Sequence, residues 1–217
     1  CPVKTEEGSS VHVLPYRLKQ ETVQSIINVN EPNLVFRPEW FSEMKYVSVL
    51  QLGRWESSAK YLNQVEDSHM PIWLALLSQH QVLKGFVIGE PRPGGNYCKL
   101  ADLLGLENLR KLSIHTIHVD INKTSDAAKR ELISLAKFKK LRSLSISWSR
   151  LYDTPKKPPL MMAPVPVPLE KLNLHYFPGS KIPDWLMQWE LNNLRKLYIR
   201  DGSLSGNNAN GLSKWCA

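Results

Sequence analysis

A six-residue phrase with apolar residues at its first, fourth and sixth positions returns six times along this chain of 217 residues. The six copies are VSVLQL (47–52), LKGFVI (83–88), LRKLSI (109–114), LRSLSI (141–146), LEKLNL (169–174) and LRKLYI (194–199). Their fourth residues stand at 50, 86, 112, 144, 172 and 197, so the intervals are 36, 26, 32, 28 and 25 residues. Self-similarity at such a period indicates a solenoid, in which each unit is covered only by its neighbours. A solenoid offers a long open surface for binding, so the repeat favours recognition over catalysis.

The leucine spacing predicts an α/β leucine-rich-repeat solenoid of about six irregular repeats, with a curved parallel sheet on its concave side. The x-L-x-L-x core of each phrase is a short strand whose side chains alternate between the interior and solvent. In four units an earlier apolar residue extends the phrase, as Leu106 does before LRKLSI. The second unit can be interpreted in two ways. Either Leu83, Phe86 and Ile88 are its buried set, or its register starts at Leu77 with His80 in a leucine position.

The segments between the phrases predict short helices and loops on the return side. Residues 125–138 are typical of a helix with Leu132, Leu135 and Phe138 on one face, and 182–189 suggest a shorter one after Pro183. Six prolines make 153–168 an extended loop, and 89–96 is another. We expect 1–40 to be a flanking segment, in which 17–30 forms either a strand or a helix over the first repeat. The repeat domain then spans 41–217, with a probable loss of repeats near 64–73.

The net charge of +8 implies attraction to an acidic partner, which is a protein face, a nucleic-acid backbone or an anionic lipid surface. No apolar run approaches the roughly 18 residues that cross a bilayer, so we expect no membrane insertion. Three cysteines without metal-ligand or CxxC spacing fit a reducing compartment, which agrees with a cytoplasmic location.

Motifs that carry catalysis or bind cofactors are missing. Gly206 and Gly211 have the spacing of a phosphate loop, but Leu212 stands where the lysine is required. His115 and His118 have no further metal ligand at a suitable spacing. The sequence therefore predicts no enzyme, no metal and no cofactor.

Outward strand positions of the third to sixth units are rich in lysine, serine and histidine. Because adjacent strands lie about 4.8 Å apart, these side chains should form rows on one concave face. The predicted partner-binding residues are Lys111, Ser113, His115, Ser145, Ser147, Lys171, Asn173, His175, Lys196, Tyr198 and Arg200. A tyrosine among positive charges is typical of interface centres. Simple solvation of a polar strand face is the alternative.

Three longer phrases resemble a known family over about residues 20–205: SIINVNEPNLVFRPEWFSEMKYVSVLQLGRW (25–55), CKLADLLGLENLRKLSI (98–114) and LEKLNLHYFPGSKIPDWL (169–186). They are similar to the leucine-rich-repeat part of plant intracellular nucleotide-binding immune receptors of the coiled-coil class. The resemblance implies a module that restrains a nucleotide-binding switch domain and recognises a pathogen effector, directly or through a guarded host protein such as a kinase-like protein. It also implies that ADP or ATP belongs to the nucleotide-binding domain of a full-length relative.

The sequence departs from that family near QVEDSHMPIW (64–73), which runs almost directly into the second unit as though repeats were deleted. A leucine-rich substrate adaptor of a ubiquitin ligase is an alternative, but it needs an N-terminal adaptor-binding helical box for which 1–40 are too short. A basic nucleic-acid-binding solenoid is a weaker alternative that depends only on charge and scattered aromatic residues, so no nucleic-acid partner is expected.

Overall fold

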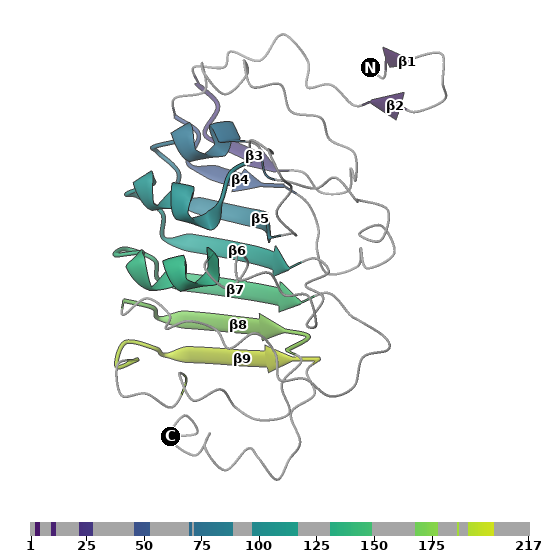
Figure 1. The fold of residues 1–217 in the computed structure, drawn as a ribbon. Helices are drawn as coiled ribbons and strands as arrows, with labels where there is room; N and C mark the ends of the chain where they lie inside the picture. Colours follow the sequence, from purple (N-terminus) through teal and green to yellow (C-terminus); the bar gives the residue numbers. More distant parts are fainter. Residues whose placement is uncertain are drawn as a thin grey trace.

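Seven parallel strands form one sheet in the computed structural model, and they follow one another in chain order (Figure 1). The structure describes residues 3–4, 10–11, 22–27, 46–52, 70, 72–88, 97–116, 131–148, 168–177, 186 and 191–201. The strands of the sheet are β3 (Ser25–Ile27), β4 (Val49–Gln51), β5 (Val82–Ile88), β6 (Lys111–Thr116), β7 (Ser143–Trp148), β8 (Lys171–His175) and β9 (Lys196–Arg200). This architecture confirms the predicted leucine-rich-repeat solenoid.

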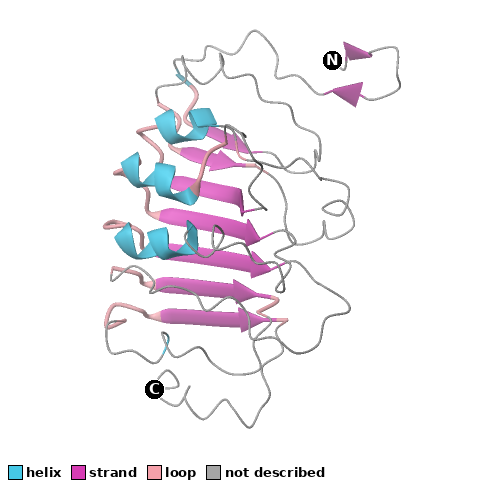
Figure 2. Cartoon of the chain, in the orientation of Figure 1, coloured by secondary structure: helices cyan, strands magenta, loops and turns pink. Residues whose placement is uncertain are grey.

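Three short 3-10 helices lie in a column beside the sheet, within the segments that return the chain from one strand to the next (Figure 2). They are η2 (Ile72–Leu76), η3 (Leu100–Gly105) and η4 (Ser134–Lys137). A separate antiparallel pair consists of β1 (Val3–Lys4) and β2 (Ser10–Val11). The return segments are linked to each other, because Glu131 Oε2 accepts a hydrogen bond from the Leu100 amide of the preceding repeat at 3.0 Å.

Apolar strand residues form the core, since the register places the same phrase position of each repeat side by side. The row that contains the first strand leucine of each phrase is Ile26, Leu50, Leu83, Leu112, Leu144, Leu172 and Leu197. Leu50, Leu83 and Leu144 are 0% exposed, so the interior of the stack excludes water at this row. Each inner leucine of the row is covered by the apolar residues of the neighbouring strands. A single repeat cannot fold alone because its leucine would be uncovered.

The structure of the second repeat agrees with both interpretations: Leu83, Phe86 and Ile88 are buried, and the register starts at Leu77. Leu83 pairs with Leu112 and Phe86 with Ile114, while the register shifts between Lys84 and Phe86. Gly85 supplies the extra residue of this bulge at φ 93°, a conformation that L side chains rarely adopt. Leu83 therefore holds the strand position that the phrase alignment had given to Phe86. The intervals between aligned leucines from Leu50 to Leu197 become 33, 29, 32, 28 and 25 residues.

His80 occupies the leucine position of the turn that leads into β5. The His80 amide donates to the Leu77 carbonyl at 3.0 Å, as the Leu109 amide does to Leu106 at 3.0 Å. The His80 side chain is 0% exposed. The register of the second repeat therefore starts at Leu77, as the second interpretation required.

The strand β3 extends the sheet into the first forty residues, which carry no leucine phrase. Ser25, Ile26 and Ile27 pair in parallel with Val49, Leu50 and Gln51. Of the two forms expected for 17–30, the described part adopts a strand over the first repeat. The domain boundary at 41 stays a prediction.

The described part of the predicted helix 125–138 is helical from residue 131 to residue 137. Leu132, Leu135 and Phe138 are 3%, 0% and 5% exposed, so this face packs into the core. Leu186 is the described residue of the predicted helix 182–189, and it is helical and buried. The loop 89–96 and, apart from Pro168, the proline-rich loop 153–168 lie outside the described residues.

Candidate functional site

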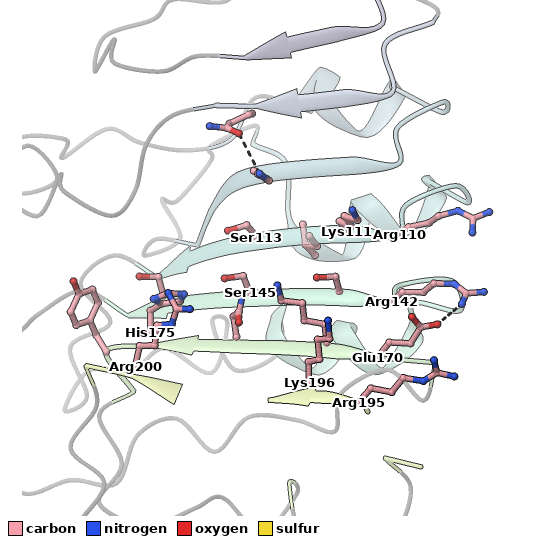
Figure 3. Close-up of a pocket in the computed structure, with 18 of the residues that line it drawn as sticks. Arg110, Lys111, Ser113, Arg142, Ser145, Glu170, His175, Arg195, Lys196 and Arg200 are labelled. Atoms are coloured by element: carbon pink, nitrogen blue, oxygen red, sulfur yellow. Dashed lines mark hydrogen bonds and ion pairs between the residues drawn. The ribbon is translucent and has the colours of Figure 1, made fainter. Parts of the chain in front are cut away.

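The open face of the sheet carries a groove of about 1140 Å³ that crosses β4 to β9 (Figure 3). In Figure 3 the labelled side chains stand in front of the sheet and the helical segments lie behind it, so the groove and the return segments occupy opposite faces. The groove is lined by Gln51, Lys84, Arg110, Lys111, Leu112, Ser113, Arg142, Ser143, Ser145, Ser147, Glu170, Lys171, Asn173, His175, Tyr176, Arg195, Lys196, Arg200 and Asp201.

Strand alternation places most of the predicted residues in this groove. Lys111 pairs with Ser143, Ser143 with Lys171, and Lys171 with Lys196, which makes one row across four strands. Parallel rows run through Ser113 and through Ser147. Nine of the eleven predicted residues line the groove: Lys111, Ser113, Ser145, Ser147, Lys171, Asn173, His175, Lys196 and Arg200. Their common face is therefore observed, and their role in partner binding stays a prediction.

Tyr198 does not line the groove itself but contacts two of its cations. The Lys171 Nζ lies 5.1 Å from the centre of the Tyr198 ring, and the Arg200 guanidinium carbon lies 5.5 Å from it. Both distances are within the range of cation–π attraction. The ring thus attracts two positive side chains from neighbouring strands, by about 0.5–1 kcal/mol for each exposed pair.

His115 is in the predicted row but is buried, so the expectation of an exposed histidine is wrong. It aligns with Ser147 on β7, yet its side chain is 4% exposed, and its β5 neighbour Val87 is 5% exposed. This end of the row is therefore covered and does not open into the groove. Burial lowers the pKa of His115 to about 4, so its imidazole is neutral at pH 7.

A row of charged residues immediately before the strands was not predicted. Arg110, Arg142, Glu170 and Arg195 each precede the first residue of a strand, and all four line the groove. Simple alternation gives these residues the same side as the buried leucines, but the backbone is not yet pleated there. The Arg110 carbonyl, for example, accepts from the Arg142 amide at 2.8 Å and the Ser143 amide at 3.0 Å. The second letters of LRKL, LRSL, LEKL and LRKL were the available signal.

An ion pair between neighbouring repeats shows how this row holds a carboxylate. A guanidinium nitrogen of Arg142 donates to Oε1 of Glu170 on the next repeat. The two side chains are 56% and 39% exposed, so the pair adds little to stability. A second polar link between strands runs from Lys84 Nζ to Gln51 Oε1 at 3.4 Å.

The groove is strongly basic. Among the residues that the structure describes, its lining contains eight lysines and arginines against two acidic residues, Glu170 and Asp201. The described residues outside the groove include five basic and three acidic residues, so basic residues are concentrated in the groove. Positive charge that is crowded on one open face attracts acidic surfaces and raises their rate of encounter.

The edge of the groove beyond β8 and β9 has a tight backbone. Tyr176 and Asp201, which directly follow these strands, have φ of 55° and 54°. The Tyr176 amide donates to the Arg200 carbonyl at 2.9 Å, which ties the two strand ends together. Both residues line the groove, so this edge is fixed relative to Arg200.

In the part of the chain that the structure describes, no three His, Cys, Asp or Glu residues come together as a metal site. His118, the predicted neighbour of His115, lies outside those residues. No helix among the described residues has the length and apolar character needed to cross a membrane.

Comparison with known proteins gives the class of this repeat. Residues 100–210, about half of the chain, match the family described as R13L1/DRL21 LRRs, in which LRR denotes leucine-rich repeats. The chain belongs to this family.

A particular relative connects the family to plant defence. The chain is 31% identical over 134 residues to "Disease resistance RPP13-like protein 4" of Arabidopsis thaliana, which covers 62% of this chain and 15% of that protein. The match thus spans a small part of the relative's length. It confirms the predicted resemblance to the leucine-rich-repeat region of plant nucleotide-binding disease-resistance proteins.

Proposed function

We propose that this chain is the non-catalytic recognition module of a plant intracellular immune receptor and that the groove is its partner-binding surface. The observation that carries the proposal is the charge of the groove on the open side of the sheet. Its described lining includes eight basic residues and only two acidic ones. Membership of the R13L1/DRL21 family and the disease-resistance relative support the same function.

The partner in a full-length receptor is a pathogen effector or a guarded host protein, such as a kinase-like protein, in the cytoplasm. The same module restrains the receptor's own switch domain, which holds the ADP or ATP. Exposed cations suit this work because they attract an acidic partner at long range and fix its orientation on contact. Affinity then comes from the close contacts that the open face allows.

The test is a pull-down from plant cytosol with the full chain, at low and at high salt. The native chain is compared with Lys111→Glu/Lys171→Glu/Lys196→Glu, which reverses one row of the groove. The matched control is Lys137→Glu/Lys139→Glu/Lys140→Glu, because these lysines are exposed but do not line the groove. We expect a specific protein to be retained by the native chain and the control and lost by the groove variant.

Equal recovery of the same protein by all three chains contradicts a role of the groove in recognition. Recovery of nucleic acid alone, released by high salt, favours the basic nucleic-acid-binding alternative. Restraint is tested by expressing the chain together with the coiled-coil and nucleotide-binding segments of a receptor of this class. Undiminished cell death in that assay contradicts the inhibitory role.

A further inference from the structure

Two rows of cations cross the same four strands of the groove. The first row is Arg110, Arg142 and Arg195, with Glu170 in the place of a fourth arginine; Figure 3 shows it at one end of the strands. The second row is Lys111, Lys171 and Lys196, with Ser143 in the remaining place. Successive places in a row lie on adjacent strands, so they advance by about 4.8 Å per strand, and each of the four strands has a cation in at least one row.

The floor beside these rows is made of small polar side chains. Ser113, Ser145 and Asn173 are aligned on β6, β7 and β8 and line the groove. Arg200 and His175 stand at the opposite end of the strands (Figure 3). Long cations at one end, short residues in the middle and a further cation at the other end leave a channel that runs across the strands.

The spacing of the rows matches one secondary structure in a partner. Side chains three or four residues apart on an α-helix recur about every 5.4 Å along its axis, close to the strand spacing of about 4.8 Å. Side chains on one face of an extended segment recur about every 6.6 Å, so they lose register with the strands after one or two steps. Strands of five or six residues are about 16–20 Å long, which is wide enough for a helix about 10–12 Å across.

Glu170 shows that a carboxylate fits within the arginine row. It comes from the loop before β8, one strand beyond Arg142, and pairs with the Arg142 guanidinium. A partner carboxylate in the same row can reach Arg110 or Arg195 in an equivalent way. Arg110 and Arg195 are exposed and hold the same place before their strands as Arg142, which pairs with Glu170.

We propose that the groove binds an acidic α-helix of the partner protein, laid across β6 to β9 with one carboxylate per turn facing the cation rows. This inference deepens the proposed function and depends on it, because it names the chemistry of the partner surface that the groove recognises. From β6 to β9 the helix spans three strand intervals, about 14 Å, which corresponds to about ten residues.

The test measures fluorescence anisotropy of labelled peptides of about 18 residues, a length at which helices form in alanine-rich sequences. One peptide carries four glutamates on a single helical face, at spacings of three and four residues. The second has the same composition and helicity, checked by circular dichroism, with its glutamates distributed around the helix. Inorganic polyphosphate and a single-stranded oligonucleotide serve as competitors.

We expect the one-faced peptide to bind the native chain about tenfold more tightly than the redistributed one, since three close charge pairs together supply that factor. The Lys111→Glu/Lys171→Glu/Lys196→Glu variant should lose this preference, and the Lys137→Glu/Lys139→Glu/Lys140→Glu control should keep it. The variant Glu170→Gln should bind the one-faced peptide about two- to fivefold more tightly, because the Arg142 guanidinium can then donate to a partner carboxylate.

Equal affinity for the two peptides or weaker binding after Glu170→Gln overturns the helical partner. The same conclusion follows if polyphosphate or the oligonucleotide displaces the labelled peptide at a lower concentration than the unlabelled one-faced peptide does. If the peptides bind alike while the pull-down still recovers a groove-dependent protein, only the helical form of the partner is wrong. If the peptides bind alike and the pull-down recovers no groove-dependent protein, the proposed function is contradicted as well.

Discussion

Acidification should weaken the solenoid through His80, the buried histidine in a leucine position. Burial lowers the pKa of His80 to about 4 from the value of 6.5, and the nearby backbone of Leu77 opposes this shift only in part. The unfolded chain therefore binds a proton below pH 6.5, whereas the folded chain keeps this imidazole neutral until about pH 4. The contribution of the neutral His80 to the free energy of unfolding is fully present above pH 6.5. It is lost as the pH falls from 6.5 towards 4.

The size of the effect follows from the two pKa values. At pH 5 the unfolded imidazole is almost fully protonated and the folded one almost fully neutral, which lowers the free energy of unfolding by about 2 kcal/mol relative to pH 7.5. His115, whose pKa burial also lowers to about 4, adds a similar amount. The native chain should thus lose about 4 kcal/mol between these pH values from its two buried histidines.

Urea denaturation at pH 7.5 and pH 5 of the native chain and of His80→Leu separates this contribution from that of the carboxylates. The leucine variant should be at least as stable as the native chain at pH 7.5, because leucine makes the same turn at Leu109 and Leu194. Its loss of stability at pH 5 should be smaller by about 2 kcal/mol. The same loss in both chains would refute the assignment of the pH dependence to this histidine.

Three further experiments probe the core and the second repeat. Leu144→Ala, at the fully buried centre of the sheet, should lower the free energy of unfolding by about 2–5 kcal/mol in urea denaturation, and a loss below about 1 kcal/mol would show a loosely packed core. Gly85→Ala should cost about 1–3 kcal/mol, because alanine is strained at φ 93°; an unchanged midpoint would contradict the bulge. With Cys1→Ser and Cys216→Ser in place, Cys98 should resist maleimide at pH 8 until the chain unfolds, since burial raises its pKa to about 12; rapid labelling of the folded chain would show an accessible thiol.

The buried rows could be predicted from the sequence because they depend on local spacing. Leu112 and Leu144 repeat within nearly identical phrases, and parallel pairing of identical phrases leaves one register in which all leucines face inward. The second repeat was ambiguous for a physical reason. One inserted glycine shifts every later side chain of β5, and the sequence does not show whether Gly85 is inside the strand ladder or outside it.

Features that depend on contacts beyond the repeat could not be predicted. Alternation gave the correct side of the sheet for His115 but could not show that this end of the row is covered. Ser25–Ile27 has no leucine phrase, and its strand form is set by pairing with Val49–Gln51. The arginine row depends on a shared carbonyl at the entry to each strand, where Arg110 and its equivalents leave the pleated pattern.

Solvation alone favours neither sign of charge on the open face. An outward strand position needs only a polar side chain, and glutamate or serine satisfies that need as well as lysine does. If solvation were the sole requirement, the groove would approach the ratio of five basic to three acidic residues among the described residues outside it. It contains eight against two, and Lys171 and Lys196 are direct register neighbours although like charges across strands are destabilising. The packing of the buried leucine rows offsets this repulsion between lysines. An acidic partner would bind more tightly by the free energy that it gains from removing the repulsion.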